Sequence, residues 1–316
     1  MVIKNNAEFG VELALAVPYA YWLHEHGQLE TVITSKGMKP FYYFCNDVRE
    51  EFNSRTIDNA AAGLNDLPNI WIHGDTKAGT VMTNPGVLDY SQWKLPPYKE
   101  YYKTNEFSSF NSSKIPNFKK PTVFISNIYN HPDTSDVRHY HHFSIQSLYE
   151  IFTKLKEKGY DVIYKRETNN NTEITFDQNE INATMLSNSL IADVEGHGII
   201  SDFDLCSYFN NIYLFNDIID SLSMSYNEVQ LKLLANCNKY ISVCGGNAIL
   251  SSCFGGTTII YVTQGKELRT NYFSNESYFH QLSKAKILPV FDLVSDIKKR
   301  GHHDSSEIIK MIEKEF

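Results

Sequence analysis

The stretch from Lys239 to Glu267, KYISVCGGNAILSSCFGGTTIIYVTQGKE, decides the fold. Its apolar run over 240–243 predicts a short buried strand, and the first glycine pair, Gly245-Gly246, predicts a sharp turn. Residues 247–254 have the length and apolar spacing of a short helix that the second glycine pair ends, and 257–262 is again strand-like. A strand, a glycine turn, a helix and a strand usually close right-handed into a parallel pair.

The glycine turn is the first candidate for ligand binding. Glycines let the backbone approach a ligand, and the free N–H groups at the start of a helix attract anions. We therefore expect a diphosphate at a site formed by Cys244, Gly245, Gly246, Asn247 and Ala248. The alternative is that the turn is structural, because every α/β fold contains glycine-bearing turns.

Length and composition bound the possible functions. The chain has 316 residues, 42% hydrophobic and 21% charged, which suits a globular protein of two domains. Its formal net charge of −8 argues against nucleic acid or an anionic membrane as a partner. No apolar run is long enough to span a bilayer. Five cysteines at irregular spacing favour reduced thiols and a cytoplasmic location. The oligomeric state stays open.

The rest of the chain repeats the same pattern of strands and helices. A helix over 11–26, ended by Gly27, lies between an apolar start and a strand over 29–34. The polar stretch 104–121 is typical of a linker. We therefore predict an α/β protein with domains at 1–118 and 119–302 and a last helix at about 303–316. The other expected strands are 41–44, 69–73, 122–126, 162–164 and 212–215, and the other expected helices are 48–52, 145–158 and 226–237.

Two Rossmann-like halves with the glycine turn in the second half resemble a GT-B glycosyltransferase. The residues that carry the resemblance are Ser242 to Ala248 and Gly265 to Arg269. It implies that the two halves face each other across a cleft, that the second binds a nucleotide-diphosphate sugar, and that the first presents a glycan or other hydroxyl acceptor. It also implies that the last helix crosses back onto the first half. The small size and Asn-rich composition are similar to compact transferases encoded by large DNA viruses, which would place the protein in the host cytoplasm.

Such a transfer must stabilise the departing diphosphate. Without a metal, backbone N–H groups and cationic side chains carry that task. Arg269, and Lys165 or Arg166 at another strand end, are the candidate cations, because open α/β sheets bind ligands at the carboxyl ends of their strands. The alternative is that they are exposed surface charges. Glu267 is a candidate partner of the ribose hydroxyls, or it forms a surface ion pair.

Three further strand-end residues are expected to line the nucleotide site. Ser126 and Asn127 follow the first strand of the second half, and Phe215 ends a later strand, where it would frame the base. The alternative for Ser126 and Asn127 is ordinary turn chemistry. No cofactor is expected; the donor substrate is a nucleotide-diphosphate sugar, with a UDP-sugar as the first expectation.

The chain lacks a clear Glu-bearing motif of retaining enzymes, so the resemblance leaves the stereochemistry open. We expect an inverting transfer rather than a retaining one, and an inverting transfer needs a base in the first half. Asp75, in a Gly-Asp-Thr loop, is the favoured candidate, although it also suits a simple turn. Glu8 opens a helix and equally suits a helix N-terminus. His73 ends an expected strand, whose buried side the pattern leaves open.

Three alternatives remain at this point. Asp202-Phe203-Asp204 resembles the metal-binding DxD of GT-A transferases, although Ser201 or Asp202 equally suits a helix cap. A nucleotide-sugar epimerase of the same fold is the second alternative. A module that binds a nucleotide sugar without catalysis is the third.

Overall fold

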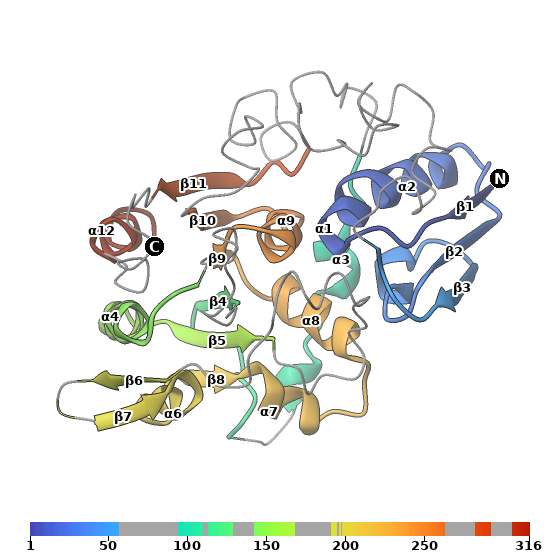
Figure 1. Ribbon diagram of the computed structural model, residues 1–316. Coiled ribbons are helices and arrows are strands. Elements are labelled where there is room, and N and C mark those ends of the chain that lie inside the picture. Colours follow the sequence, from blue (N-terminus) through green and yellow to red (C-terminus); the bar gives the residue numbers. More distant parts are fainter. Residues whose placement is uncertain are drawn as a thin grey trace.

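The computed structural model describes residues 1–56, 94–109, 113–128, 142–167, 191–194, 196, 198–262, 282–291 and 305–316. Two separate parallel sheets organise these residues, a three-stranded sheet in the first half and a six-stranded sheet in the second (Figure 1). A two-stranded antiparallel hairpin, β6 (Ile191–Val194) with β7 (Gly198–Ser201), is the third sheet.

The first half begins with a strand, a long helical segment and a second strand, as expected. β1 (Val2–Lys4) pairs with β2 (Thr31–Ser35), which pairs with β3 (Asp47–Phe52). The helical segment buries its apolar residues and ends at Gly27, whose φ of 67° suits glycine. It consists of α1 (Phe9–Val11), a π-helical stretch (Glu12–Ala16) and α2 (Val17–Glu25).

Two expectations for the first half are wrong. Residues 41–44 were expected to be a strand, but Lys39–Tyr42 forms a 3₁₀ helix with Pro40 at its start, where the fixed φ of proline suits a helical turn and its missing N–H costs nothing. Residues 48–52 were expected to be a helix, but they belong to β3, because Val48 aligns with Val32 of β2. Pairing with β2 outweighs the weak local preference of DVREEF. The strand expected at 69–73 lies outside the described residues.

The segment between the halves is packed in part. α3 (Tyr98–Tyr102) buries Tyr98 and Tyr102 and lies along a helix of the second half, α8 (Tyr226–Ala235). The stretch expected to be a linker includes a 3₁₀ turn (Glu106–Ser109), and its Phe107 and Ile115 are buried. Part of this stretch therefore belongs to the core.

The six-stranded sheet has the order β11-β10-β9-β4-β5-β8, and all its recorded strand pairs are parallel. From β4 the chain runs outward to β5 and β8, and then returns to β9 on the other side of β4. The order of the strands therefore reverses between β4 and β9. The strands are β4 (Thr122–Asn127), β5 (Asp161–Arg166), β8 (Ile212–Leu214), β9 (Lys239–Val243), β10 (Thr257–Val262) and β11 (Lys286–Phe291).

Helices cover both faces of this sheet. One apolar cluster contains Ile163 together with residues of α8, of α9 and of the first half, so the two halves share a core. The other cluster contains Val162 and Tyr164 together with residues of α4 and α12, because successive residues of a strand point to opposite faces. In Figure 1, α8 and α9 lie between this sheet and the first half. The remaining helices are α4 (Ile145–Glu157), α6 (Asp202–Ser207), α7 (Phe215–Asp220), α9 (Gly246–Ser252) and α12 (Ser306–Glu315).

The last helix packs on the second half, so the expectation that it crosses back to the first half is wrong. α12 contacts α4, β10 and β11, and its Ile308 and Ile312 are buried there. Lys158 Nζ donates to the carbonyl oxygens of Ile312 at 3.0 Å and Glu313 at 2.9 Å. A lysine bound to the last carbonyls of a helix stabilises its end. None of the helices in the described ranges has the length and apolarity needed to cross a bilayer.

Candidate functional site

The carboxyl ends of β4 and β9 mark the point where the strand order reverses. In open α/β sheets, ligands bind outside the carboxyl ends of the strands at such a point. β4 ends at Asn127, and β9 ends at Val243, immediately before the glycine turn. The turn that the sequence singled out therefore lies at the position where this class of sheet binds its ligands.

At the glycine turn, Gly245 leaves the backbone open. Its φ of 128° and ψ of −163° form a conformation that side chains strongly disfavour, and a Cβ built there would meet nothing within 4 Å. The backbone N–H groups of Gly245, Gly246 and Asn247 make no hydrogen bond with the described residues. Such a row of free N–H groups is suited to an anion.

At Gly246, residues of the first half occupy the space that a side chain would need. A Cβ at Gly246 would lie 2.9 Å from Cδ1 of Phe9 and 3.3 Å from the nitrogen of Gly10, in the first half. A Cβ at Gly10 would lie 3.2 Å from Gly246 Cα and 3.1 Å from Cδ1 of Ile249. The space beside Gly246 is therefore filled by the first half, and close packing explains this glycine without any ligand.

Glu8 is brought to the same place. Its Oε2 accepts a hydrogen bond from the backbone N–H of Val11 at 3.1 Å and caps α1. The same oxygen lies 3.2 Å from the point that a Cβ of Gly10 would occupy, as does Gly246 Cα. The second oxygen, Oε1, has no partner among the described residues. Of the three candidate bases, the structure describes only this one, because His73 and Asp75 lie outside the described residues.

Beneath the turn, Lys165 is buried among three acceptors. Its Nζ donates to Oδ1 of Asn247 at 3.0 Å, to Oε1 of Glu167 at 2.9 Å and to Oε1 of Gln230. Burial lowers the pKa of Lys165, and the Glu167 carboxylate opposes that shift. An ammonium group has three N–H donors, so all of them have partners here. Sequence reasoning missed Gln230, which is one of eight buried residues of a short helix and gives no local signal.

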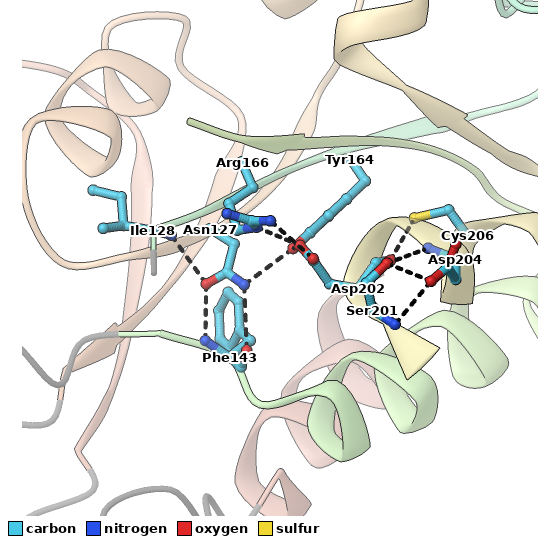
Figure 2. A network of polar contacts seen from close by, with 9 residues as sticks. All are labelled: Asn127, Ile128, Phe143, Tyr164, Arg166, Ser201, Asp202, Asp204 and Cys206. Atoms are coloured by element: carbon cyan, nitrogen blue, oxygen red, sulfur yellow. Dashed lines mark hydrogen bonds and ion pairs between the residues drawn. The ribbon is translucent and has the colours of Figure 1, made fainter. Parts of the chain in front are cut away.

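Arg166, the next residue, points to the opposite face of the sheet. Its guanidinium lies against the carboxylate of Asp202 (Figure 2). Nε of Arg166 is 2.5 Å from Oδ2 of Asp202, and Nη2 is 3.0 Å from Oδ1. Both side chains are fully buried, and the hydroxyl of Tyr164 donates to the same carboxylate at 2.7 Å. Burial raises the pKa of Tyr164 well above its usual value. Arg166 is thus part of an internal ion pair on the α4 and α6 side.

The same network engages both aspartates of the DxD-like motif. Asp204 accepts from the hydroxyl of Ser201 at 2.7 Å and from its backbone N–H at 3.0 Å, while Ser201 accepts from the Asp204 N–H (Figure 2). This is a capping box at the start of α6, and it lowers the pKa of Asp204. The capping alternative is confirmed. No group of three potential metal ligands occurs among the residues the structure describes.

At the end of β4, Asn127 is used structurally. Its Oδ1 accepts from the backbone N–H groups of Ile128 and Phe143, and its Nδ2 donates to Phe143 O at 3.3 Å and Tyr164 Oη at 3.1 Å (Figure 2). All four hydrogen-bonding positions of the amide are therefore occupied. Ser126 is buried and aligned with Ser242 of β9.

Three other candidates lie in the core, and two lie outside the described ranges. Phe215 is packed edge-on against Phe124 and Tyr226. Cys244 and Ala248 are buried, and the Cys244 N–H donates to Tyr261 O at 2.9 Å. These side chains are therefore part of the core. Glu267 and Arg269 lie outside the described residues.

A buried carboxyl group in the first half was not expected from the sequence. Glu12, in the π-helical stretch, accepts from Thr34 Oγ1 at 2.5 Å and from the hydroxyl of Tyr42 at 2.9 Å. Burial raises the pKa of Glu12, and the nearby positive charge of Arg55 opposes the shift. The signal was available, because Glu12 is the one charged residue in the apolar run over 11–23.

A cavity of about 760 Å³ opens between residues of the first half and residues at and before α8. Its lining combines tyrosine rings with lysine and glutamate side chains, but none of the residues around the glycine turn. The lining residues are Lys36, Gly37, Lys39, Pro40, Tyr42, Tyr43, Cys45, Val48, Glu50, Tyr101, Tyr102, Ser225, Glu228 and Lys232.

Comparison with known proteins supports the fold. No protein-family model matches the chain. No curated protein matches it either. The crystal structure of the glycosyl transferase family 9 from Veillonella parvula DSM 2008 is similar with a TM-score of 0.51 and 8% identity, over 99% of this chain and 95% of that one.

A second similar structure is the bacterial iron-containing dodecameric glycosyltransferase TibC from enterotoxigenic E. coli H10407. Its TM-score is 0.39 at 11% identity, over 82% of this chain and 57% of that one. The similarity to viral transferases that the sequence suggested stays a prediction. The likeness to the first structure, over almost the whole of both chains, confirms the two Rossmann-like halves of the GT-B arrangement.

Proposed function

We propose that the protein is a GT-B glycosyltransferase that moves a sugar from a nucleotide-diphosphate sugar to the hydroxyl group of a glycan or other acceptor. The observation that carries this proposal is the position of Glu8, from the first half, beside the open glycine turn of the second half. A carboxylate and an anion site, contributed by opposite halves, are the two groups that an inverting transfer needs. The likeness to a glycosyltransferase of family 9 supports the same function. We propose residues 1–118 and 119–302 as the acceptor and donor domains.

In the proposed reaction, the acceptor hydroxyl attacks the anomeric carbon on the face opposite the diphosphate. The bond between that carbon and the diphosphate oxygen breaks, and its electron pair leaves with the diphosphate. The N–H groups of Gly245, Gly246 and Asn247 would stabilise the developing charge. The proton of the acceptor passes to the base.

We propose Glu8 as that base, with Asp75 and His73 kept as candidates. Capping of α1 holds one oxygen of Glu8, while the other has no partner among the described residues and is available to a hydroxyl group. Glu267 and Arg269 are kept as proposed contacts of the ribose and the diphosphate. Arg166, Asn127 and Phe215 are not kept as nucleotide contacts, because the polar side chains of the first two are occupied and the third is packed in the core.

The proposal contains no metal step. The carboxylates that a metal-dependent transferase would use, Asp202 and Asp204, bind Arg166 and cap α6 instead. Turnover that is lost in EDTA and restored by Mn²⁺ would contradict this part of the proposal. The variants Asp202→Asn and Asp204→Asn would then be measured for loss of the turnover that Mn²⁺ restores.

The function is tested with purified protein and a panel of nucleotide sugars, each with and without a glycan acceptor. Transfer to the acceptor supports the proposal. Isomerisation of the sugar would indicate the epimerase alternative, and binding without turnover would indicate a binding module. A thermal-shift screen with UDP, GDP, TDP, ADP and CMP identifies the nucleobase that the donor carries. A nucleotide that binds only the folded state raises the melting temperature of the protein. We propose UDP as the preferred nucleotide.

A further inference from the structure

The partners of Lys165 fix the orientation of one amide at the glycine turn. An ammonium group only donates hydrogen bonds, so the atom of Asn247 that lies 3.0 Å from Lys165 Nζ must be its oxygen. The amide nitrogen of Asn247 therefore faces away from Lys165. A neutral or acceptor side chain at position 165 would not impose this choice.

The amide nitrogen of Asn247 donates to no acceptor among the described residues. Only 5% of Asn247 is exposed, yet its Nδ2 makes no hydrogen bond with the part of the chain that is described. A buried side chain that keeps two N–H donors unpaired loses hydrogen-bond energy unless a ligand or water accepts them.

Asn247 lies next to the open N–H groups of the turn. The helix that follows, α9, has only seven residues, so its first N–H groups alone are a weak anion site. The amide of Asn247 adds two side-chain donors at the second residue of this helix.

We propose that Nδ2 of Asn247 donates hydrogen bonds to the diphosphate of the nucleotide, and that Lys165 is a positioning residue that holds the amide in the donating orientation. This inference rests on the proposed function and extends it, because it assigns a side chain to a site otherwise formed by backbone N–H groups. Lys165 does not contact the phosphates itself, since its three donors are occupied.

A second chain of amides supplies a matched control. Lys165 donates to Gln230, and Nε2 of Gln230 donates to Oδ1 of Asn227 at 3.5 Å. Nδ2 of Asn227 in turn donates to the carbonyl oxygen of Gly37 at 2.6 Å. This chain leads toward the first half and away from Asn247. Gln230→Met removes a buried partner of Lys165 but leaves the bond from Lys165 to Asn247 in place.

The test measures dissociation constants of UDP and of uridine by calorimetry, with GDP and ADP in parallel, for the parent and three variants. Asn247→Asp keeps an acceptor for Lys165 but replaces the NH₂ group with a charged oxygen. We expect it to weaken UDP binding at least tenfold and to leave uridine binding unchanged, since a hydrogen bond to a charged group is lost. Lys165→Met should weaken UDP binding threefold or more, because the amide of Asn247 is then free to rotate. Gln230→Met should lower the melting temperature but keep the parental ratio of the dissociation constants of uridine and UDP.

Parental UDP binding by Asn247→Asp would overturn the inference even if Lys165→Met fails to fold. Loss of the UDP preference in Gln230→Met, to the same extent as in Lys165→Met, would also overturn it, because the effect would then follow general stability. If the parent binds none of the three diphosphates, the proposed function fails together with the inference. If the parent prefers UDP to uridine and both site variants keep that preference, only the inference fails.

Discussion

Gly10 and Gly246 face each other across the junction of the two halves, so closely that a Cβ on Gly10 would lie 3.2 Å from Gly246 Cα. This contact joins α1 of the first half to the start of α9, directly after β9, in the second half. It also changes the meaning of Gly246. The sequence suggested a ligand as the reason for this glycine, whereas the structure gives Phe9 and Gly10 as a sufficient reason.

We expect Gly246→Val to lower the free energy of unfolding by about 1–3 kcal/mol, as for other overpacked sites. The Cβ of residue 246 would lie 2.9 Å from Cδ1 of Phe9. Gly246→Val should therefore destabilise the protein less when Phe9 is replaced by Ala. Urea denaturation of the four proteins measures this coupling. Gly159→Ala is the control, because Gly159 has a φ of 81° and no neighbour within 4 Å, and its cost should be the same with or without Phe9. Additive costs of Gly246→Val and Phe9→Ala would contradict the contact.

Arg166→Met should destabilise the protein by about 3–5 kcal/mol, because the carboxylate of Asp202 would be left buried and unpaired. The double variant Arg166→Met, Asp202→Leu should recover most of that loss. The control is Arg49→Ala, which removes an exposed pair with Asp47 and should change stability little. A double variant as unstable as the single one would show that the pair is not the cause. Chemical denaturation with far-UV detection provides the measurement.

Glu12 should make stability depend on pH. Burial raises its pKa in the folded state above the unfolded value, so its contribution to stability is fully present below the unfolded pKa, near 4.5. That contribution is lost as pH rises through the folded pKa. Glu12→Gln removes this titration, so its free energy of unfolding relative to the parent should increase between pH 4 and pH 8. A difference that is constant over this range, measured by urea denaturation, would contradict the prediction.

Glu8→Gln should keep donor binding and lower kcat about 100-fold or more, the low end for the loss of a general base. The amide oxygen can still accept from the Val11 N–H, so the cap of α1 is retained. Asp75→Asn is measured beside it with the same donor and acceptor. If Asp75→Asn loses turnover and Glu8→Gln does not, Asp75 is the base, as the sequence favoured. Calorimetric binding of the nucleotide separates either effect from loss of the donor site.

Ile312→Ala should lower the free energy of unfolding by about 2–5 kcal/mol, since Ile312 is fully buried between α12 and the second half. Lys310→Ala, at an exposed position of the same helix, is the matched control. Equal, small effects of both variants on the urea midpoint would show that α12 is not docked on this half.

Local pattern was enough to predict the framework of the second half. The strand, turn, helix and strand from Lys239 to Val262 occur as expected, and so do α4 and α8. These elements are predictable because their apolar residues fall in runs of helical or strand length, and glycines follow α4, β9 and α9. Where local preference was weak, at 41–44 and 48–52, pairing with β2 and the position of Pro40 decided the structure.

The sequence by itself determined which strand ends carry polar residues, and it named Glu8, the glycine turn and the pair Lys165-Arg166. Only the tertiary structure decided what these residues do. Lys165 and Arg166 are adjacent in the chain but point to opposite faces, so Lys165 bonds to Asn247 and Arg166 pairs with Asp202. Gly10 and Gly246 are far apart in the chain and acquire their contact only when the halves pack together. The partners of these four residues lie in distant segments of the chain, and local spacing of residue types does not predict such contacts.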